Sequence, residues 1–276
     1  MYRVVCKRAL NEAVTWMEVE APLIARKARA GQFVILRVNE TGERIPLTIA
    51  AHDAARGTVT VIFQKVGKTT LLLDTLEVGD SRLDFVGPLG RATEIEGHKK
   101  VAVIGGGVGT AIAYPEAKAF FDAGAHVDMI VGFRNKDMVI LEEECRAVST
   151  RLFVMTDDGS NGHPGFVTAK LQELLDAGES YDLVLAIGPL PMMRAVANVT
   201  RPVGVKTLVS MNPIMIDGTG MCGGCRLTVG GETKFACVDG PEFDAHQVDW
   251  DEAMKRLGQY REHEADCRLM FLKGNE

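Results

Sequence analysis

The sequence lacks any apolar run of roughly 18 residues, the length that would cross a membrane as a helix, so no membrane span is predicted. It has no block of Lys or Arg, and its formal net charge is −6, which argues against a nucleic-acid partner. The N-terminal segment lacks the apolar core of a signal peptide, so a cytoplasmic protein is expected. No internal repeat interrupts the 276 residues, a length that predicts more than one domain.

Cysteine is scarce, and three of the six cysteines fall within sixteen positions, which does not resemble a disulfide framework. Cys222, Cys225 and Cys237 have the spacing of the last three ligands of a plant-type [2Fe-2S] site. The first ligand position of that pattern is Asp217 instead of cysteine. Glycines permit a tight backbone wrap and leave N–H groups for sulfur; they stand at Gly218, Gly220, Gly223 and Gly224.

Two questions about this cysteine cluster stay open. Zinc competes for a C-x2-C pair, but the nearest downstream histidine, His246, lies outside the usual spacing of zinc ligands. The fourth ligand is either the carboxylate of Asp217 or the thiol of Cys267, with Cys6 more remote. Otherwise Cys145 and Cys267 are interpreted as buried small apolar residues.

Residues 1–95 are punctuated by Gly and Asp and contain six segments rich in Val, Ile, Phe and Thr. These predicted strands are 2–9, 15–20, 32–38, 46–51, 58–65 and 82–86. One helical pattern covers residues 69–76. Short strands with a single helix predict a small antiparallel barrel.

From residue 96 to residue 208 strands alternate with helices, which predicts an α/β domain with a parallel sheet. The predicted strands are 99–104, 126–131, 151–155 and 183–187, and the predicted helices are 111–123, 141–148 and 167–177. Pro115 removes a backbone donor from the first helix, so a kink or a late helix start is expected there.

The cluster loop is placed at residues 209–248 and a tail helix at residues 249–276. A hairpin of residues 226–229 and 234–237 is predicted across Gly230 and Gly231. Apolar side chains at helical spacing predict that the tail docks as one amphipathic helix; they are Trp250, Met254, Leu257 and Tyr260.

A glycine-rich segment joins the first α/β strand to its helix, where glycines let the backbone approach a pyrophosphate. The segment is Gly105, Gly106, Gly107, Val108, Gly109 and Thr110, and the dinucleotide fingerprint G-x-G-x-x-G fails at Thr110. A turn that needs glycine only for close packing is the alternative. Asp128 could meet an adenosine ribose and Arg134 a 2′-phosphate, so the choice between NAD and NADP is open.

Two further segments follow predicted strands at the edge where an open α/β sheet binds its ligand. They are Asp157 with Asp158 and Gly188 with Pro189, although tight turns would explain them equally well.

Two segments of the barrel are candidates for binding a flavin nucleotide. Arg44 can pair with a phosphate, and Thr48 can offer a hydroxyl to a flavin edge two residues after Pro46 and one after Leu47. A second candidate phosphate cradle opens the barrel helix at Gly67, Thr69 and Thr70. Each alone is equally typical of a turn or a helix cap, but together beside a nucleotide domain they favour a flavin.

The combination of R-x-P-L-T, G-x-T-T, GGGVGTA and a C-terminal cysteine loop resembles ferredoxin reductase-type flavoproteins over essentially the whole chain. The subgroup is that of dihydroorotate dehydrogenase electron-transfer subunits and their relatives. The four-cysteine members serve pyrimidine synthesis. Asp217 and the long tail resemble instead the small (alpha) subunits of NADH-dependent reduced ferredoxin:NADP oxidoreductases, also described as sulfide dehydrogenase beta subunits, whose cluster is held by one aspartate and three cysteines.

This resemblance implies a β barrel plus α/β architecture and three cofactors: FAD on the barrel, NAD(H) on the α/β domain, and a [2Fe-2S] cluster. Arg44, Thr48, Gly67, Thr69 and Thr70 would hold FAD. The glycine segment from Gly105 to Thr110, with Asp157, Asp158 and Gly188, would place the nicotinamide. The cluster would be held by Asp217, Cys222, Cys225 and Cys237. Hydride would pass between NAD(H) and the flavin, and single electrons between the flavin and the cluster.

The resemblance also implies a partner. In the family, a large subunit with a second flavin and [4Fe-4S] clusters performs electron bifurcation and reaches ferredoxin. This chain lacks the cysteines for those clusters, so it would be the NAD-side arm of a heterodimer or larger assembly. The alternatives are the same arm serving dihydroorotate oxidation and a zinc-stapled nucleotide-binding regulator with no redox role.

Overall fold

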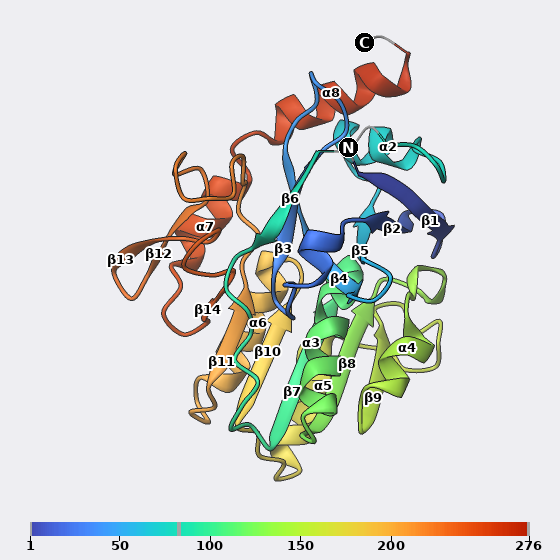
Figure 1. Cartoon of the computed structure of the whole chain (residues 1–276). Helices are drawn as coiled ribbons and strands as arrows, with labels where there is room; N and C mark the ends of the chain where they lie inside the picture. The colour runs from blue at the N-terminus through green and yellow to red at the C-terminus, as the bar shows by residue number, and fades with distance from the viewer. Residues whose placement is uncertain (1, 82–83, 275–276) are drawn as a thin grey trace.

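The computed structural model describes residues 2–81 and 84–274, and its first part is a curled six-stranded antiparallel sheet (Figure 1). The strands are β1 (Arg3–Ala9), β2 (Val14–Glu20), β3 (Phe33–Arg37), β4 (Ile45–Asp53), β5 (Thr58–Gln64) and β6 (Asp84–Leu89), in the order β1-β2-β5-β4-β3-β6. Two backbone hydrogen bonds join Val4 of β1 to Gly79 and Asp80, in the segment before β6. They bring the two edges of the sheet toward each other, which confirms the expected barrel. Residues 82 and 83 of the sixth expected strand lie outside the described residues.

The barrel also carries two short helices, α1 (Pro22–Ala25) and α2 (Lys68–Asp74). The second confirms the helical pattern expected from the sequence, and the first was not predicted because four residues are too few to show a helical period. The inward faces of the strands form one apolar core, in which Phe63, Leu36 and Met17 are fully buried.

The second part is a six-stranded mixed sheet in the order β14-β11-β10-β7-β8-β9. Its parallel strands are β7 (Lys100–Gly106), β8 (His126–Phe133), β9 (Arg151–Thr156), β10 (Leu183–Ile187) and β11 (Thr207–Ser210). The edge strand β14 (Glu242–Asp244) runs antiparallel to β11 and comes from the segment after the cysteines. The expected sheet was wholly parallel, and this edge strand was missed because three residues carry no readable period.

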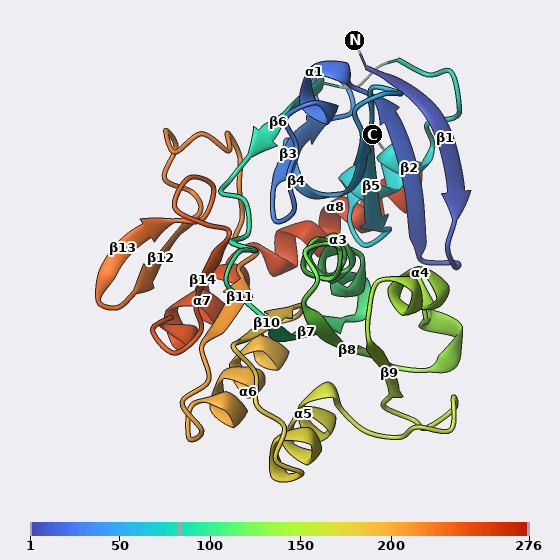
Figure 2. The same ribbon diagram turned by 60° about the horizontal axis from the view of Figure 1, so that its bottom comes forward.

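Helices cover both faces of this sheet (Figure 2). On one face α3 (Thr110–Asp122) and α4 (Glu142–Ala147) share a core with barrel residues such as Val14 and Ile62. On the other face lie α5 (Val167–Asp176) and α6 (Leu190–Thr200), and α6 was not predicted. Two 3-10 turns, η1 (Gly107–Gly109) and η2 (Lys136–Met138), complete the domain. The first helix begins at Thr110 and continues through Pro115, so of the two expected outcomes, a kink or a late start, the late start is wrong.

The last part carries the cysteine loop, a hairpin and two helices. The hairpin strands β12 (Arg226–Val229) and β13 (Glu232–Phe235) turn at Gly230 and Gly231, whose φ angles of 60° and 79° suit glycine, which confirms the turn. The tail forms two helices, α7 (Trp250–Leu257) and α8 (Arg261–Leu272). The expected single docked helix is therefore wrong: Trp250 is buried in α7, whereas α8 has no buried residue.

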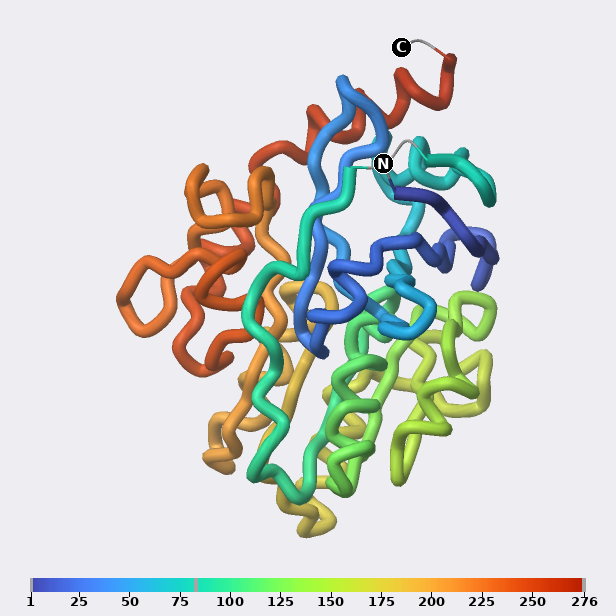
Figure 3. Tube along the Cα trace, viewed as in Figure 1, coloured from blue at the N-terminus to red at the C-terminus, as the bar shows by residue number. Residues whose placement is uncertain are grey.

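The tube view shows that α8 runs from the cysteine segment across the barrel toward α2 (Figure 3). Among the helices of residues 2–81 and 84–274, none is long and apolar enough to span a membrane.

A buried carboxyl pair lies where the three parts meet. Glu116 of α3 is fully buried, and its carboxyl lies within hydrogen-bonding reach of the carboxyl of Glu242, a contact that requires a proton on one of the two groups. Glu242 of β14 accepts a bond of 2.6 Å from the hydroxyl of Thr93, which lies on the segment that leaves the barrel. Burial raises the pKa of Glu116 well above its ordinary value, and the charge of Glu242 raises it further.

We expect Glu116→Gln to stabilise the protein at pH 8 and not at pH 4. A folded-state pKa above the unfolded one means that stability is full below the unfolded pKa and is lost as pH rises through the folded pKa. The amide imitates the protonated acid, so the variant should gain on the order of 1–3 kcal/mol at the higher pH. Urea unfolding at both pH values measures the gain, and an equal effect at both would contradict the assignment.

Candidate functional site

The glycine segment after β7 is shaped by close packing against β10. A Cβ on Gly109 would meet the carbonyl oxygen of Ile187 and lie 2.9 Å from Cα of Gly188. A Cβ on Gly106 would meet the sulfur of Met192. Packing therefore accounts for these two glycines, as the alternative interpretation of the sequence proposed, and it brings the segment against residue 188.

Gly105 is restricted as well, because a Cβ there would lie 2.8 Å from Cα of Thr110, but Gly107 is free of such packing. Gly107 has a φ of +57°, and a Cβ there would meet no atom within 4 Å, so this glycine serves the turn and faces open space. Thr110 is fully buried at the start of α3, and its hydroxyl has no hydrogen-bond partner within the described residues. The segment therefore combines an open glycine turn, a helix N-terminus and a hydroxyl without a partner in the described part of the chain. A nucleotide phosphate could accept hydrogen bonds from such a group of donors.

The other nucleotide-site candidates lie at the carboxyl ends of parallel strands, on the same edge of the sheet as this turn. Asp157 and Asp158 follow β9 and are exposed, and Oδ1 of Asp158 accepts from the backbone N–H of Ser160 at 2.9 Å. Gly188 and Pro189 follow β10, and the backbone of Gly188 lies against Gly106. The structure thus places the three sequence segments at one edge of the sheet.

Asp128 does not belong to that edge. It is fully buried in the first half of β8, where its oxygens accept from Arg151 Nε at 2.7 Å and from the Tyr181 hydroxyl at 2.8 Å. Burial alone would raise its pKa, but the bonds from Arg151, Tyr181 and His126 hold that pKa below its ordinary value. The expectation that Asp128 contacts a ribose is wrong, because an ion pair uses the carboxylate. Arg134, by contrast, is exposed just beyond the end of β8.

The barrel motif lies beside the cysteine loop. Arg44 stands immediately before β4, and its Nε donates to the carbonyl of Ile216 at 2.9 Å. Pro46, Leu47 and Thr48 lie in β4 and pair with β3. A Cβ on Gly218 would come within 2.6 Å of Ile35 and 2.9 Å of Leu89, so the loop backbone packs directly on two barrel strands.

The turn before α2 approaches the same strand. The hydroxyl of Thr70 accepts from the N–H groups of Gly67 and Val66, each at 3.1 Å. Thr69 is buried, and its hydroxyl donates to Glu43 at 2.8 Å, one residue before Arg44. The two barrel motifs are therefore brought together, and the Thr69 hydroxyl would have to leave Glu43 to contact a phosphate.

The three clustered cysteines are free thiols, and two of them, Cys225 and Cys237, face each other in the loop. Sγ of Cys225 lies 3.2 Å from Sγ of Cys237, and both residues are buried, whereas Cys222 is exposed. Backbone N–H groups point at sulfur: that of Gly224 is 3.4 Å from Cys222 Sγ, and that of Cys237 is 3.5 Å from Cys225 Sγ. Burial, and then the neighbouring Cys225, raises the pKa of Cys237 to about 12, so a bound metal would have to displace its proton.

Asp217 opens the loop and is tied to it by hydrogen bonds. Its Oδ1 accepts from the N–H of Thr219 at 2.6 Å and from the Thr219 hydroxyl at 2.5 Å, and its Oδ2 accepts from the N–H of Cys222 at 2.7 Å. These bonds, that of the Thr219 hydroxyl first, hold the pKa of Asp217 far below its usual range, so the group is a carboxylate.

These donors suit an iron–sulfur cluster: thiols and an anionic carboxylate surround a turn whose N–H groups face sulfur. Gly218, Gly220 and Gly223 adopt φ angles of 78°, 87° and 66°, which only glycine takes easily. In the described part of the chain, no group of three or more His, Cys, Asp or Glu is arranged to hold a single metal ion.

Within residues 2–81 and 84–274, none of the other three cysteines makes a hydrogen bond to a sulfur atom of the loop. Cys267 lies on α8, 3.7 Å from Nε2 of His263 on the same helix, and it is partly exposed, so the expectation that it is buried is wrong. Cys6 belongs to β1 of the barrel. Cys145 is fully buried in α4, as expected.

Two arginines at the loop escaped the sequence analysis. Arg226 donates to the carbonyl of Gly223 at 3.3 Å, and Arg256 of α7 donates to the carbonyl of Gly224 at 3.1 Å. The signal for Arg226 was its place directly after Cys225. Arg256 gave no signal, because the contact joins residues far apart in the chain.

Comparison with known proteins identifies two parts of the chain. Residues 103–198 match the family model "Oxidoreductase NAD-binding domain", and residues 212–249 match "Iron-sulfur cluster binding domain of dihydroorotate dehydrogenase B". The fold and the site thus define an oxidoreductase subunit that combines an NAD-binding domain with an iron–sulfur cluster-binding domain.

Relatives that match almost the whole chain identify the family within this class of oxidoreductase subunits. A dihydroorotate dehydrogenase B (NAD(+)) electron transfer subunit homolog of Thermotoga maritima is 47% identical over 270 residues, covering 98% of this chain and 95% of that protein. The chain belongs to the family of dihydroorotate dehydrogenase B electron transfer subunits and their homologues. A protein of Clostridium beijerinckii described only as an uncharacterized protein in the adh 3′ region is 48% identical over 283 residues, covering 100% of this chain and 96% of that protein.

Solved structures show the same fold. A chain of an NADH-dependent reduced ferredoxin-NADP oxidoreductase, studied for flavin-based electron bifurcation, superimposes with a TM-score of 0.92 at 45% identity, covering 99% of this chain and 98% of that one. The ferredoxin reductase of carbazole 1,9a-dioxygenase is 21% identical with a TM-score of 0.62, covering 74% and 65% of the two chains, and shares the fold alone. The expected ferredoxin reductase-type architecture is confirmed.

Proposed function

We propose that this chain is the NAD(H)-side electron-transfer subunit of a flavin-based electron-bifurcating NADH-dependent ferredoxin:NADP oxidoreductase. The observation that carries the proposal is the likeness to a chain of such an enzyme over 99% of this sequence, with a TM-score of 0.92. Asp217 at the first position of the cluster motif agrees with it. The domain division 1–95, 96–208, 209–248 and 249–276 assigns one cofactor to each of the first three parts.

FAD is proposed to bind along the start of β4 and the turn before α2. Arg44 would pair with a phosphate through its remaining guanidinium N–H groups while its Nε stays on Ile216. Thr48, with Pro46 and Leu47, would border the flavin, and Gly67, Thr69 and Thr70 would meet the phosphates. The contact of this strand with the cysteine loop supports a flavin next to the cluster.

NAD(H) is proposed to bind at the carboxyl edge of the parallel sheet. The open turn at Gly107 would admit the pyrophosphate above Thr110, whose orphaned hydroxyl supports the assignment. Gly105, Gly106 and Gly109 would keep the segment close to the sheet. Asp157 and Asp158, together with Gly188 and Pro189, would place the nicotinamide.

The [2Fe-2S] cluster is proposed to be held by Asp217, Cys222, Cys225 and Cys237. When bound, the flavin supplies the exchange between the two-electron chemistry of nicotinamide and the one-electron chemistry of the cluster. The chain's own residues position these groups and, in this proposal, none serves as a general acid or base. The buried pair Cys225 and Cys237 would lie on the protein side of the cluster and the exposed Cys222 on the outer side.

A larger catalytic subunit is the proposed electron partner, because relatives of this chain are named electron transfer subunits. We propose that it carries a second flavin and [4Fe-4S] clusters and passes electrons to ferredoxin, in a cytoplasmic heterodimer or larger assembly. The outer side of the cysteine loop suits a protein contact, since Met221 is 88% exposed and Ile216 is 53% exposed beside Cys222.

The competing function is electron transfer for an NAD-dependent dihydroorotate dehydrogenase, which the names of several relatives favour. Purification of the untagged partner with this chain, followed by assays with ferredoxin plus NADP and with orotate, tests the two. We expect NADH oxidation that needs reduced ferredoxin and NADP together, because NADH and reduced ferredoxin both supply the electrons that reduce NADP. Oxidation of NADH driven by orotate alone would replace the proposal with the competing function.

Asp217→Cys tests the unusual ligand. We expect the variant to keep its cluster, because a thiolate is the usual donor at this position, but to change its reduction potential and EPR g-values. Thr219→Ala, which removes one hydrogen bond to the same carboxylate, is the control and should change the spectrum less. An unchanged spectrum in Asp217→Cys would mean that another residue is the fourth ligand.

A further inference from the structure

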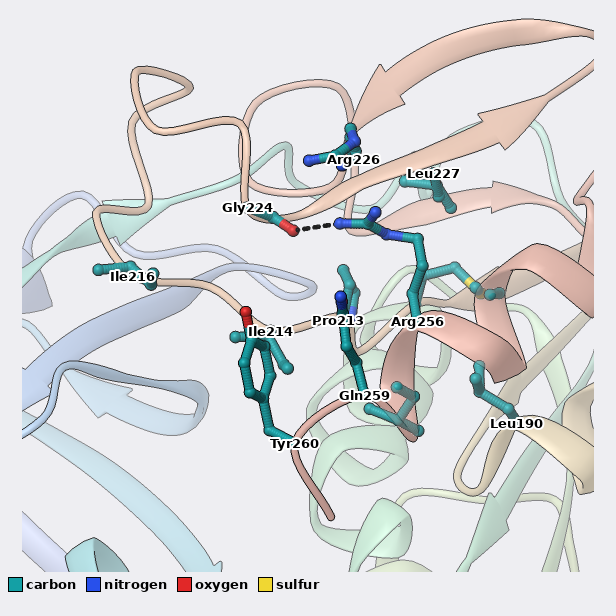
Figure 4. A pocket seen from close by; sticks show the side chains of 13 residues that line it. Leu190, Pro213, Ile214, Ile216, Gly224, Arg226, Leu227, Arg256, Gln259 and Tyr260 are labelled. Atoms are coloured by element: carbon teal, nitrogen blue, oxygen red, sulfur yellow. Dashed lines mark hydrogen bonds between the residues drawn. The ribbon is translucent and has the colours of Figure 1, made fainter. Parts of the chain in front are cut away.

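The turn between Cys222 and Cys225 is held from outside by two guanidinium groups. Arg226 Nη1 donates to the carbonyl oxygen of Gly223 at 3.3 Å, and Arg256 Nη2 donates to that of Gly224 at 3.1 Å. Figure 4 shows Arg256 reaching from the tail helix to the Gly224 carbonyl. Both carbonyls of this glycine turn are therefore bonded to positive groups.

This arrangement fixes the direction of the amide dipoles at the loop. The carbonyl of Gly223 and the N–H of Gly224 belong to one planar peptide unit, so they point in opposite directions. Arg226 holds the oxygen, and the N–H lies 3.4 Å from Sγ of Cys222. The carbonyl of the next unit is turned to Arg256. The positive end of the first dipole thus faces sulfur, and the oxygens face the arginines.

Arg256 is well anchored for this role. Helix α7 is attached to strand β12 through two bonds of Thr228: its N–H donates to Glu252 at 3.0 Å, and its carbonyl accepts from the N–H of Asp249 at 2.9 Å. The Asp249 side chain also caps the helix by accepting from the N–H of Glu252 at 2.9 Å. The end of α7 therefore stands at a fixed place relative to the hairpin that follows Cys225.

The charge of Arg256 has no carboxylate to neutralise it. Among the ion pairs of the described residues, none includes Arg256 or Arg226. Arg256 is partly buried and borders a cavity of about 200 Å³ whose other walls are mainly apolar, including Leu190, Ile214 and Leu227 (Figure 4). A charge in such surroundings is screened less than one in water.

We propose that Arg256 is a positioning residue for the iron–sulfur cluster, which fixes the Gly223–Gly224 turn and raises the cluster's reduction potential. The inference rests on the proposed function, in which the loop holds a [2Fe-2S] cluster. A cluster held by this loop would become one unit more negative on one-electron reduction. A nearby cation and N–H groups directed at sulfur stabilise that added charge.

Helix α7 would thus help to set the reduction potential of the cluster, in addition to its packing role. Removing the cation should favour the oxidised cluster, so that less of it is reduced at a given solution potential. Arg256→Gln removes the charge and the fork of donors. Lys255→Gln makes the same charge change one residue away on the exposed side of α7 and is the matched control. Arg256→Lys keeps the charge but loses the planar fork.

Redox titration of the holoprotein, followed by low-temperature EPR of the reduced cluster, measures the effect. We expect Arg256→Gln to lower the reduced-to-oxidised ratio at fixed potential by about tenfold, which equals about 59 mV for one electron. Lys255→Gln should change the ratio less than about twofold. Arg256→Lys should restore most of the ratio but keep altered g-values. Iron content and thermal unfolding of each variant are recorded alongside.

Three results decide the inference. An Arg256→Gln variant with the iron content, potential and g-values of the unchanged protein overturns it. If Arg256→Gln cannot retain a cluster, Arg256→Lys is decisive, and wild-type g-values in that variant overturn the positioning role. Failure of the proposed function looks different, because the unchanged protein itself would then contain no [2Fe-2S] cluster.

Discussion

Cys237→Ser is expected to lower the iron content of the purified protein by about tenfold or more, because a hydroxyl is a poorer iron ligand than a thiolate. Cys237 is buried, and its sulfur lies 3.2 Å from that of Cys225, so few other groups can take its place. NADH should still reduce the flavin, because the barrel and the α/β domain do not depend on this side chain. The measurements are iron analysis, EPR after reduction, and flavin absorbance.

Cys267→Ser is the matched control. Its sulfur contacts His263 on the exposed tail helix, and Cys267 is not among the proposed cluster ligands. We expect full iron content and an unchanged EPR spectrum. If Cys267→Ser loses iron while Asp217→Ala keeps it, the ligand set is Cys267 with three loop cysteines and the assignment of Asp217 is wrong.

Gly109→Ala is expected to slow reduction of the flavin by NADH by at least about tenfold and to destabilise the fold by roughly 1–3 kcal/mol. The added methyl would meet the backbone oxygen of Ile187 and lie 2.9 Å from Cα of Gly188. Backbone atoms cannot rotate away as a side chain can, so the start of α3 must move from β10. That movement displaces both the glycine turn and the segment at Gly188 that together border the proposed nicotinamide site.

Gly124→Ala separates the site effect from lost stability. Gly124 follows α3 at its far end with a φ of +85°, and a methyl there would meet no atom within 4 Å. Its conformation is strained for alanine, so a loss of about 1–2 kcal/mol is expected without a change in the rate of flavin reduction. Stopped-flow kinetics and urea unfolding of both variants measure the two effects. Equal slowing in both would mean that the rate follows stability and not the geometry of the glycine turn.

The cluster loop and the nucleotide turn were predictable because their chemistry is local in sequence. Cys222, Cys225 and Cys237 are spaced by short loops, and the two glycines at 230 and 231 specify a tight hairpin turn. The glycine segment before Thr110 gave the strand-to-helix junction for the same reason. In these segments the backbone conformation is determined by residues that are neighbours in the sequence, so a sequence pattern can predict it.

The errors arose where distant residues decide the outcome. Asp128 has the chain position expected of a ribose ligand, but Arg151 and Tyr181, which lie 23 and 53 residues away, bind its carboxylate inside the sheet. The sequence of the tail predicts one amphipathic helix. In the structure a break at Gly258 separates α7, which is docked, from α8, which is exposed. Arg256 and Gly224 are 32 residues apart in the sequence, so no local pattern predicts the hydrogen bond between them.

The central claim is that this chain carries electrons from NAD(H) through a flavin to a [2Fe-2S] cluster. Its most direct test is anaerobic addition of NADH to the purified chain, with flavin absorbance, cluster EPR and metal and flavin content measured on the same sample. The account predicts one FAD and one [2Fe-2S] cluster per chain, bleaching of the flavin, and the EPR signal of a reduced cluster. A colourless protein that contains zinc but no iron, and that does not respond to NADH, would contradict it.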